Sequence, residues 1–317
     1  MKPDDLAMLL AAIKAKLAAL GVGARVGIVG GTPVAFDLLQ ALAGMQLRDR
    51  IQGIYVPKEQ TGGTWKPVEQ LRVDSPEIVV IASDREKEQL ITLALPHLSP
   101  HTHILIGGYS HFEFRDALFE EENRNSLIPS FANGYPNSLI HIFQCLKNAA
   151  HRNLEGAVAE FGMFKGGTTM LMSRFIERLG KNWKVYGFDS FAGFPAPRSP
   201  LDMYAHPDCV YLDELLVRRM FQERNVEIIA GDIVSTIGQI AGLPIVLAFV
   251  DTDNFTSASS ILDVIQDQVV PGGAIVFDHF TGRNRFLYTL GERMAAKRLL
   301  DDARYFNLHD TGVFLRQ

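Results

Sequence analysis

The stretch Glu160-Phe161-Gly162-Met163-Phe164-Lys165-Gly166-Gly167-Thr168 decides the fold of this chain. An apolar run, Gly156-Ala157-Val158-Ala159, precedes it, and residues 170–179 after it have the pattern of a helix. The stretch therefore indicates a strand that ends in an acid, followed by a glycine-rich turn and a helix N-terminus. Glycines let the backbone approach a ligand closely, and the first turn of a helix offers free N–H groups. This arrangement is how α/β folds hold a nucleoside.

Two later apolar segments also end in an acid. The first leads to Asp189 and Ser190, where a carboxylate would accept both ribose hydroxyls of a nucleoside. The second leads to Asp232, which would accept from an adenine amino group with Ile233 beside the ring. The alternative for each acid is that it caps the helix that follows. On the sequence alone both interpretations stay open.

Four titratable side chains follow the last two apolar runs. Asp251 and Asp253 come after one run, and Asp278 and His279 come after the other. Ligands bind at the carboxyl ends of the strands in open α/β sheets, so these four side chains should converge. Unpaired carboxylates would repel one another, which predicts a bound cation or a shared proton. The alternative is a set of solvated loop acids.

The chain is long enough for two domains, because 317 residues exceed the usual single domain. Apolar strand patterns alternate with helical ones in both halves, which is typical of α/β folds with a parallel sheet. We predict one Rossmann-like domain over residues 1–125, with a structural, oligomerisation or substrate-binding role, and a second over residues 126–317. The polar stretch 120–125 is the expected linker. The second sheet should end in an antiparallel hairpin near residues 305–315.

The first domain carries only a weak dinucleotide fingerprint. Its turn reads Gly30-Gly31-Thr32-Pro33-Val34-Ala35, so Thr32 replaces the glycine that a pyrophosphate approaches. The following strand ends in Tyr55-Val56-Pro57-Lys58, without an acid for a ribose. A nicotinamide oxidoreductase is therefore disfavoured. The loop at 61–66, which contains an aromatic side chain, is a candidate contact for a substrate group.

Composition excludes several classes of partner. The net charge of −5 is spread along the chain and leaves no basic footprint for nucleic acid or an anionic membrane. No uncharged run approaches the roughly 20 residues that a membrane span needs. Only Cys145 and Cys209 are present, which favours a reducing compartment over a disulfide framework. We expect a cytoplasmic protein that forms homo-oligomers.

Over residues 135–317 the chain resembles the macrocin O-methyltransferase-like family of class I methyltransferases. That family typically reads E-x-G-V-W-R-G-G where this chain has residues 160–167, and G-x-D-S-F-x-G-L-P where it has residues 187–195. Pro271-Gly272-Gly273 before the last parallel strand also matches. The resemblance implies an S-adenosylmethionine-dependent methyltransferase fold. The candidate donor-binding residues are Glu160, Gly162, Met163, Phe164, Gly166, Thr168, Asp189, Ser190, Asp232, Ile233 and Asp251.

The same resemblance suggests a cation site and a base. The family commonly has D-x-D and D-D, so Asp251 and Asp278 would be cation ligands and Asp253 a candidate base. His279 stands where a third carboxylate is expected. Magnesium prefers oxygen ligands, so either another metal such as manganese binds with His279 as a ligand, or no metal binds and His279 itself takes the proton.

The expected reaction is methyl transfer to a hydroxyl of a sugar or small natural product. The proline-rich segment 194–211 would close over donor and acceptor as a lid, or is a mere connecting loop. Methyl transfer to nitrogen or carbon, another reaction of the same cofactor, and a non-catalytic scaffold that keeps the fold are the alternatives. The sequence does not identify the methyl acceptor.

Overall fold

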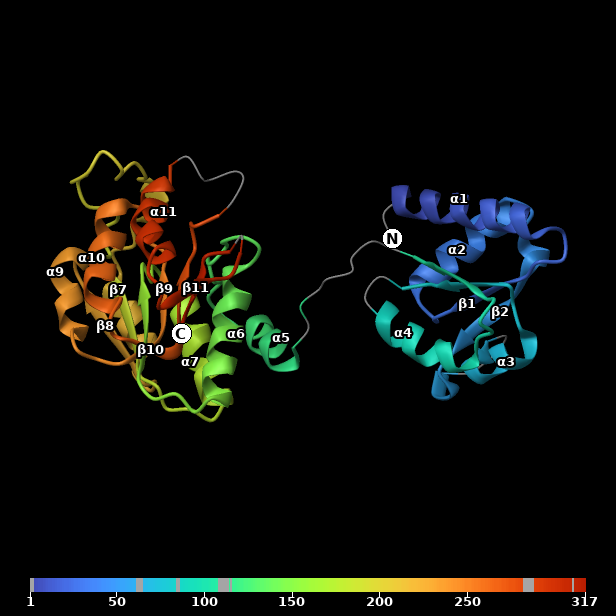
Figure 1. Cartoon of the computed structure of the whole chain (residues 1–317), viewed down its shortest axis with the longest axis horizontal. Coiled ribbons are helices and arrows are strands. Elements are labelled where there is room, and N and C mark those ends of the chain that lie inside the picture. The colour runs from blue at the N-terminus through green and yellow to red at the C-terminus, as the bar shows by residue number, and fades with distance from the viewer. Residues whose placement is uncertain are drawn as a thin grey trace. The chain divides into compact units, whose positions relative to one another are not determined.

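The computed structural model describes residues 3–60, 65–83, 86–107, 114, 116–281, 288–309 and 311–317. The chain divides into two compact units, Met1–Glu113 and Phe114–Gln317 (Figure 1). The expectation of two α/β domains is confirmed. Most of the candidate substrate loop at 61–66 lies outside the described residues.

The first unit is built on a parallel sheet. Among its described residues the strand order is β3-β2-β1-β4-β5, and every pair is parallel. The central strands β1 and β4 are buried along their whole length, since their runs are almost entirely apolar. The elements are α1 (Pro3–Leu20), β1 (Val26–Val29), α2 (Pro33–Gly44), β2 (Ile51–Val56), β3 (Lys66–Pro67), α3 (Leu71–Asp74), β4 (Ile78–Ile81), α4 (Lys87–Ala94) and β5 (His103–Ile106).

The turn after β1 is closed by the unit's own side chains. Thr32 caps α2 by accepting from the Ala35 N–H, and its hydroxyl donates to the Ala82 carbonyl. A Cβ on Gly31 would lie 2.7 Å from the ring of Trp65. The indole therefore fills the space through which a pyrophosphate would approach this turn, in keeping with the weak fingerprint of the sequence.

The second unit contains a larger mixed sheet. Its strand order over the described residues is β11-β12-β10-β9-β6-β7-β8, with β12 antiparallel to both β10 and β11. The predicted closing hairpin is thus confirmed. The elements are α5 (Ala117–Arg124), α6 (Ser138–His151), β6 (Ala157–Phe161), α7 (Gly167–Arg178), β7 (Val185–Asp189), α8 (Glu214–Met220), β8 (Val226–Ala230), α9 (Ile233–Thr236), β9 (Ile245–Val250), α10 (Phe255–Ile265), β10 (Val269–Phe277), α11 (Leu290–Ala296), β11 (Tyr305–Asn307) and β12 (Val313–Arg316).

Helices cover both faces of this sheet (Figure 1). One apolar core joins Ala157, Ala159 and Phe161 of β6 to α9, α10 and α11. The other joins the intervening Val158 to α5, α6 and α7. Because successive side chains of a strand point to opposite faces, a single apolar run supplies both cores. The carboxyl ends of the parallel strands are left free at one edge.

The unit boundary differs from the one expected at residue 125. The polar stretch read as a linker is mostly helix α5, whose N-cap is Asp116. Phe119 of this helix joins the core, and Glu122 pairs with Arg174 at 2.5 Å and Arg178 at 2.6 Å. The helix is amphipathic, so its charged side chains gave the stretch the composition of a linker although one face is buried. Residues 114–125 thus belong to the second unit.

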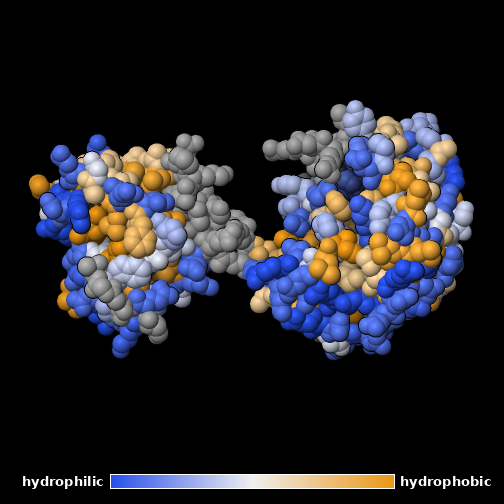
Figure 2. Space-filling view, turned by 180° about the vertical axis from the view of Figure 1, so that it is seen from behind, coloured by the Kyte–Doolittle hydropathy of each residue, from blue (hydrophilic) through white to orange (hydrophobic). Residues whose placement is uncertain are grey.

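Polar and apolar side chains are mixed on the face of the molecule shown in Figure 2. In the part of the chain that the structure describes, no helix combines the length and apolar character needed to cross a bilayer.

Candidate active site

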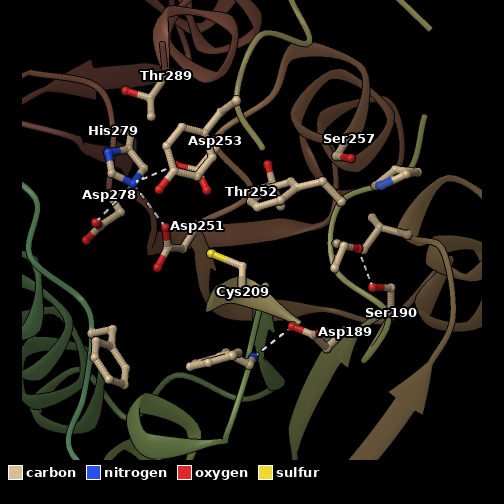
Figure 3. A pocket seen from close by; sticks show the side chains of 18 of the residues that line it. Asp189, Ser190, Cys209, Asp251, Thr252, Asp253, Ser257, Asp278, His279 and Thr289 are labelled. Carbon is tan, nitrogen blue, oxygen red and sulfur yellow. Dashed lines mark hydrogen bonds and ion pairs between the residues drawn. The ribbon is translucent and has the colours of Figure 1, made fainter. Parts of the chain in front are cut away.

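A cavity of about 390 Å³ opens at the carboxyl ends of the second unit's strands. The sequence motifs meet there as expected, since residues from the turns after β6, β7, β8, β9 and β10 line the same space (Figure 3). Four predicted donor-site residues are not in its lining: Glu160, Met163, Gly166 and Thr168. The predicted residues that do line the cavity are Gly162, Phe164, Asp189, Ser190, Asp232, Ile233, Asp251, Asp253, Asp278 and His279.

Glu160 and Thr168 lie behind the cavity wall. Glu160 is 2 % exposed and accepts a hydrogen bond from the Thr169 hydroxyl on α7. Burial, and after it the nearby Asp189, raises the pKa of Glu160 to about 8 against the hydrogen bonds it accepts. Thr168 shares a hydrogen bond of 2.7 Å with Ser130. Both residues tie the glycine turn to its surroundings.

The glycines of the motif are required by close packing. Gly162 has a φ of +93°, and a Cβ there would lie 2.0 Å from the carbonyl oxygen of Asp251. Gly166 has a φ of +82° and is the N-cap of α7. The turn therefore packs against the end of β9, which places Phe164 at the cavity.

Asp189 holds two loops at the donor end. Its Oδ2 accepts from the Phe164 N–H at 2.7 Å, and its Oδ1 accepts from the Phe191 N–H at 2.7 Å. Burial raises the pKa of Asp189 against these hydrogen bonds. Each carboxylate oxygen keeps a further lone pair for another donor. The predicted position of this acid at the end of the second strand, β7, is confirmed.

Asp232 satisfies the capping interpretation as well as lining the cavity, whereas no described helix begins at Asp189 or Ser190. The Ser190 hydroxyl donates to the Gly193 carbonyl at 2.6 Å and stabilises the turn after β7. Asp232 accepts from the Val234 N–H at 3.1 Å at the start of α9. It also pairs with Arg198 from the segment that covers the cavity.

Three carboxylates surround one imidazole at the other end of the cavity. His279 Nε2 lies 3.0 Å from Asp253 Oδ1, 3.3 Å from Asp251 Oδ1 and 3.5 Å from Asp278 Oδ2 (Figure 3). Burial opposes a charge on the ring, but the hydrogen bonds to Asp251 and Asp253 outweigh it and raise the pKa of His279 to about 12. The ring therefore carries its proton at neutral pH in this arrangement, as the expected repulsion among the acids requires.

Asp278 has one satisfied oxygen and one orphaned oxygen. Its Oδ1 accepts from the N–H groups of Asn133 and Gly134, each at 2.9 Å, and from the Ser138 hydroxyl. Its Oδ2 is buried, and no described residue makes a hydrogen bond to it. One ligand atom each from Asp251, Asp278 and His279 lies within 4.8 Å of the others. This donor set fits a divalent cation, and its nitrogen favours manganese over magnesium.

Glu292 is a site residue that the sequence interpretation missed. It is fully buried on α11, and burial raises its pKa to about 7. Its carboxylate accepts from the N–H groups of Thr252, Asp253 and His279, each at 2.9 Å. The sequence does contain one indication that Glu292 is buried. Its spacing places it on the same helix face as the apolar Ala295, Ala296 and Leu299.

The segment 194–211 covers the cavity and is anchored near its middle. Asp202 accepts from the backbone N–H of Thr256 at 2.8 Å and from its hydroxyl at 2.7 Å. Asn254 exchanges hydrogen bonds of 3.0 and 2.9 Å with the backbone of Tyr204. The sequence predicted that this segment lies over the cavity, as the structure shows. Its closure over donor and acceptor stays a prediction.

Comparison with known proteins assigns the second unit. The family model described as Macrocin-O-methyltransferase (TylF) matches residues 136–317. No curated protein sequence matches the chain.

Several solved structures are similar to this chain. The O-methyltransferase NovP is 21 % identical, with a TM-score of 0.48, and covers 56 % of this chain and 78 % of its own. The calicheamicin methyltransferase CalS11 is 18 % identical, with a TM-score of 0.47, over 65 % of this chain and 95 % of its own. The methyltransferase PaMTH1 of Podospora anserina, with bound S-adenosylhomocysteine, is 13 % identical, with a TM-score of 0.38, over 66 % and 99 %.

The resemblance noted in the sequence is thus confirmed by a family match that spans more than half of the chain. With the glycine turn, the acids at the strand ends and the mixed sheet in place, the chain belongs to the macrocin-O-methyltransferase family and is an S-adenosylmethionine-dependent methyltransferase.

Proposed function

We propose that this enzyme methylates a hydroxyl of a sugar or small natural product. The observation that carries the proposal is the shared cavity, in which the donor motif at Gly162 and Asp189 faces the cluster of Asp251, Asp253, Asp278 and His279. A donor bound at the first group would direct its methyl toward the second. CalS11, one of the structures with this fold, is described as a TDP-rhamnose 3'-O-methyltransferase, which is the class of acceptor that we favour here.

The donor end would hold the nucleoside of S-adenosylmethionine. Asp189 would accept the ribose hydroxyls through the lone pairs that its backbone donors leave free. Ile233 and Asp232 would flank the adenine, with the Asp232 carboxylate shared between the ring's amino group and Arg198. Four predicted residues outside the cavity lining would contribute indirectly, by holding the glycine-rich turn after β6 in its conformation: Glu160, Met163, Gly166 and Thr168.

Asp253 is the proposed base. As the acceptor oxygen forms its bond to the methyl carbon, the carbon–sulfur bond breaks, neutral S-adenosylhomocysteine leaves, and the hydroxyl proton passes to Asp253. His279 is less suited to this task, because its raised pKa means that it already holds a proton. Its interaction with Asp253 orients the carboxylate instead.

Once His279 gives up the proton that it holds in the cation-free arrangement, Asp251, Asp278 and His279 would hold a divalent cation, of which manganese is our first choice and magnesium the second. When bound, such an ion acidifies a coordinated hydroxyl, which eases its deprotonation. The Oδ2 of Asp278 accepts no hydrogen bond from the described residues and has only the 3.5 Å contact with His279, so it is the atom in this group that most needs such a partner.

The test is a transfer assay with methyl-labelled S-adenosylmethionine and a panel of nucleotide-linked deoxysugars and glycosylated natural products. We expect one methyl ether in the product, located by NMR, with loss of turnover in Asp251→Ala. A product methylated on nitrogen or carbon would overturn the choice of a hydroxyl acceptor. Full turnover in Asp251→Ala would overturn the assignment of the site.

Three further expectations stay predictions. They are self-association of the chain, a cytoplasmic location, and a structural, oligomerisation or substrate-binding role for the first unit.

A further inference from the structure

The carboxylate of Glu292 joins two loops that carry the reactive side chains. Its Oε2 accepts from the N–H groups of Thr252 and Asp253, which follow β9, and its Oε1 accepts from the N–H of His279, which follows β10. All three distances are 2.9 Å. Each oxygen of this buried side chain therefore has a backbone partner, and the two loops share one acceptor group.

One of these loops has an uncommon backbone. Asp253 has a φ of +61°, in the left-handed region that residues other than glycine rarely occupy. Such a conformation persists when the surroundings over-determine it. The hydrogen bond from the Asp253 N–H to Glu292 is one such constraint, and the 3.0 Å contact of its side chain with His279 is another.

Gly291, the residue before Glu292, allows helix α11 to approach the loop after β9 closely. A Cβ on Gly291 would lie 2.2 Å from the Leu201 carbonyl oxygen and 2.6 Å from the Phe255 nitrogen. Only glycine fits between these groups, so α11 begins directly against the start of α10. Gly291 thus permits the close packing of α11 that brings the Glu292 carboxylate within hydrogen-bond distance of the two loops.

We infer that Glu292 is a positioning residue, which fixes Asp253 and His279 relative to each other and so sets the geometry of the acceptor end. The contacts do not depend on the reaction, but the consequence for Asp253 as base and His279 as cation ligand rests on the proposed function.

Glu292→Gln is the informative change, because it keeps the shape of the side chain and removes one acceptor. The amide NH₂ would face a backbone N–H that it cannot accept from, so one loop must move. Glu122→Gln is the matched control. Glu122 is also buried, at 4 % exposed, but it pairs with Arg174 and Arg178 of α7.

The experiment combines crystal structures of both variants and the unchanged enzyme with Mn²⁺ titration followed by electron paramagnetic resonance. In Glu292→Gln we expect the Asp253–His279 contact to be lost and the affinity for Mn²⁺ to fall about 10- to 100-fold, as is typical when a partner of a metal ligand is removed. Binding of S-adenosylmethionine, measured by calorimetry, should be unchanged. Glu122→Gln should change neither the contact nor the affinity for Mn²⁺.

An Asp253–His279 contact retained in Glu292→Gln would overturn the inference, as would a loss of Mn²⁺ affinity equal in both variants. If the unchanged enzyme takes up no Mn²⁺, the proposed cation site fails instead. The crystal structures of Glu292→Gln then decide the role of Glu292 by themselves.

Discussion

At the residue scale, the site contains several carboxylates, and each of them has different contacts. Asp189 accepts from two backbone N–H groups, Asp253 contacts His279, and Glu292 accepts from three N–H groups. Asp278 keeps one orphaned oxygen. Under the proposed function, these different contacts would assign donor binding, proton transfer, cation binding and positioning to different residues of the same chemical type.

Asp253→Asn should lower kcat about 100-fold or more, because an amide cannot take the proton of the acceptor hydroxyl. The affinity for S-adenosylmethionine should be unchanged, since the donor end is formed by other residues. Steady-state kinetics and calorimetry of the same preparation check both parts. Equal losses in kcat and in donor affinity would show a general disturbance of the site rather than the loss of a base.

The buried Glu160 makes the stability of the donor-free protein depend on pH. The folded protein keeps the Glu160 proton up to about pH 8, because the pKa of the buried carboxyl is raised to about 8, whereas an accessible glutamate has a pKa of about 4.5. Folding therefore takes up a proton between these values, and the free energy of unfolding falls as pH rises through them. In Glu160→Gln this fall should be smaller.

Urea unfolding at pH 5 and pH 8 measures the difference. Glu177→Gln is the control, since that side chain is 75 % exposed on the same helix, α7. An identical pH dependence in Glu160→Gln and the unchanged protein would contradict the account of Glu160.

At the element scale, the turn between β6 and α7 depends on glycine for space as well as for backbone angle. Gly162 and Gly180 both have a positive φ, of +93° and +70°, but nothing lies within 4 Å of a Cβ built on Gly180. Gly180→Ala should cost about 1 kcal/mol from the backbone angle alone. Gly162→Ala should cost about 1–3 kcal/mol more, because the added methyl collides with the Asp251 carbonyl.

Chemical denaturation of the two variants separates these effects. Equal destabilisation would mean that the turn can shift away from β9 without cost. Gly162→Ala should also weaken donor binding, since such a shift moves the loop that carries Phe164.

At the scale of the whole molecule, the described lining of the cavity comes from the second unit alone. A fragment of residues 114–317 should therefore fold and bind S-adenosylmethionine with the affinity of the full chain. A fragment of residues 126–317, cut where the sequence suggested a boundary, should be less stable, because it lacks Phe119 and Glu122. Circular dichroism melting and calorimetry test both fragments. Loss of binding in the longer fragment would assign part of the donor site to the first unit.

The sequence predicted most of the fold because each strand of the second unit is a distinct apolar run, and the acids at their ends predicted where the cavity lies. Helix α5 was missed because its buried face is narrow and its composition is polar. Glu292 was missed because it follows no strand, and its contacts are with backbone groups that the sequence does not distinguish. Glu160 was predicted beside the donor, but its side chain points to Thr169.

The most direct test of the account is calorimetric titration of the purified chain with S-adenosylmethionine, alongside Asp189→Ala. We predict saturable binding at one site with a Kd on the order of micromolar. In Asp189→Ala the affinity should fall at least about 10-fold, as expected for loss of hydrogen bonds to a charged group. The absence of saturable binding, or equal affinities in the two proteins, would contradict the placement of the donor between the Gly162 turn and Asp189.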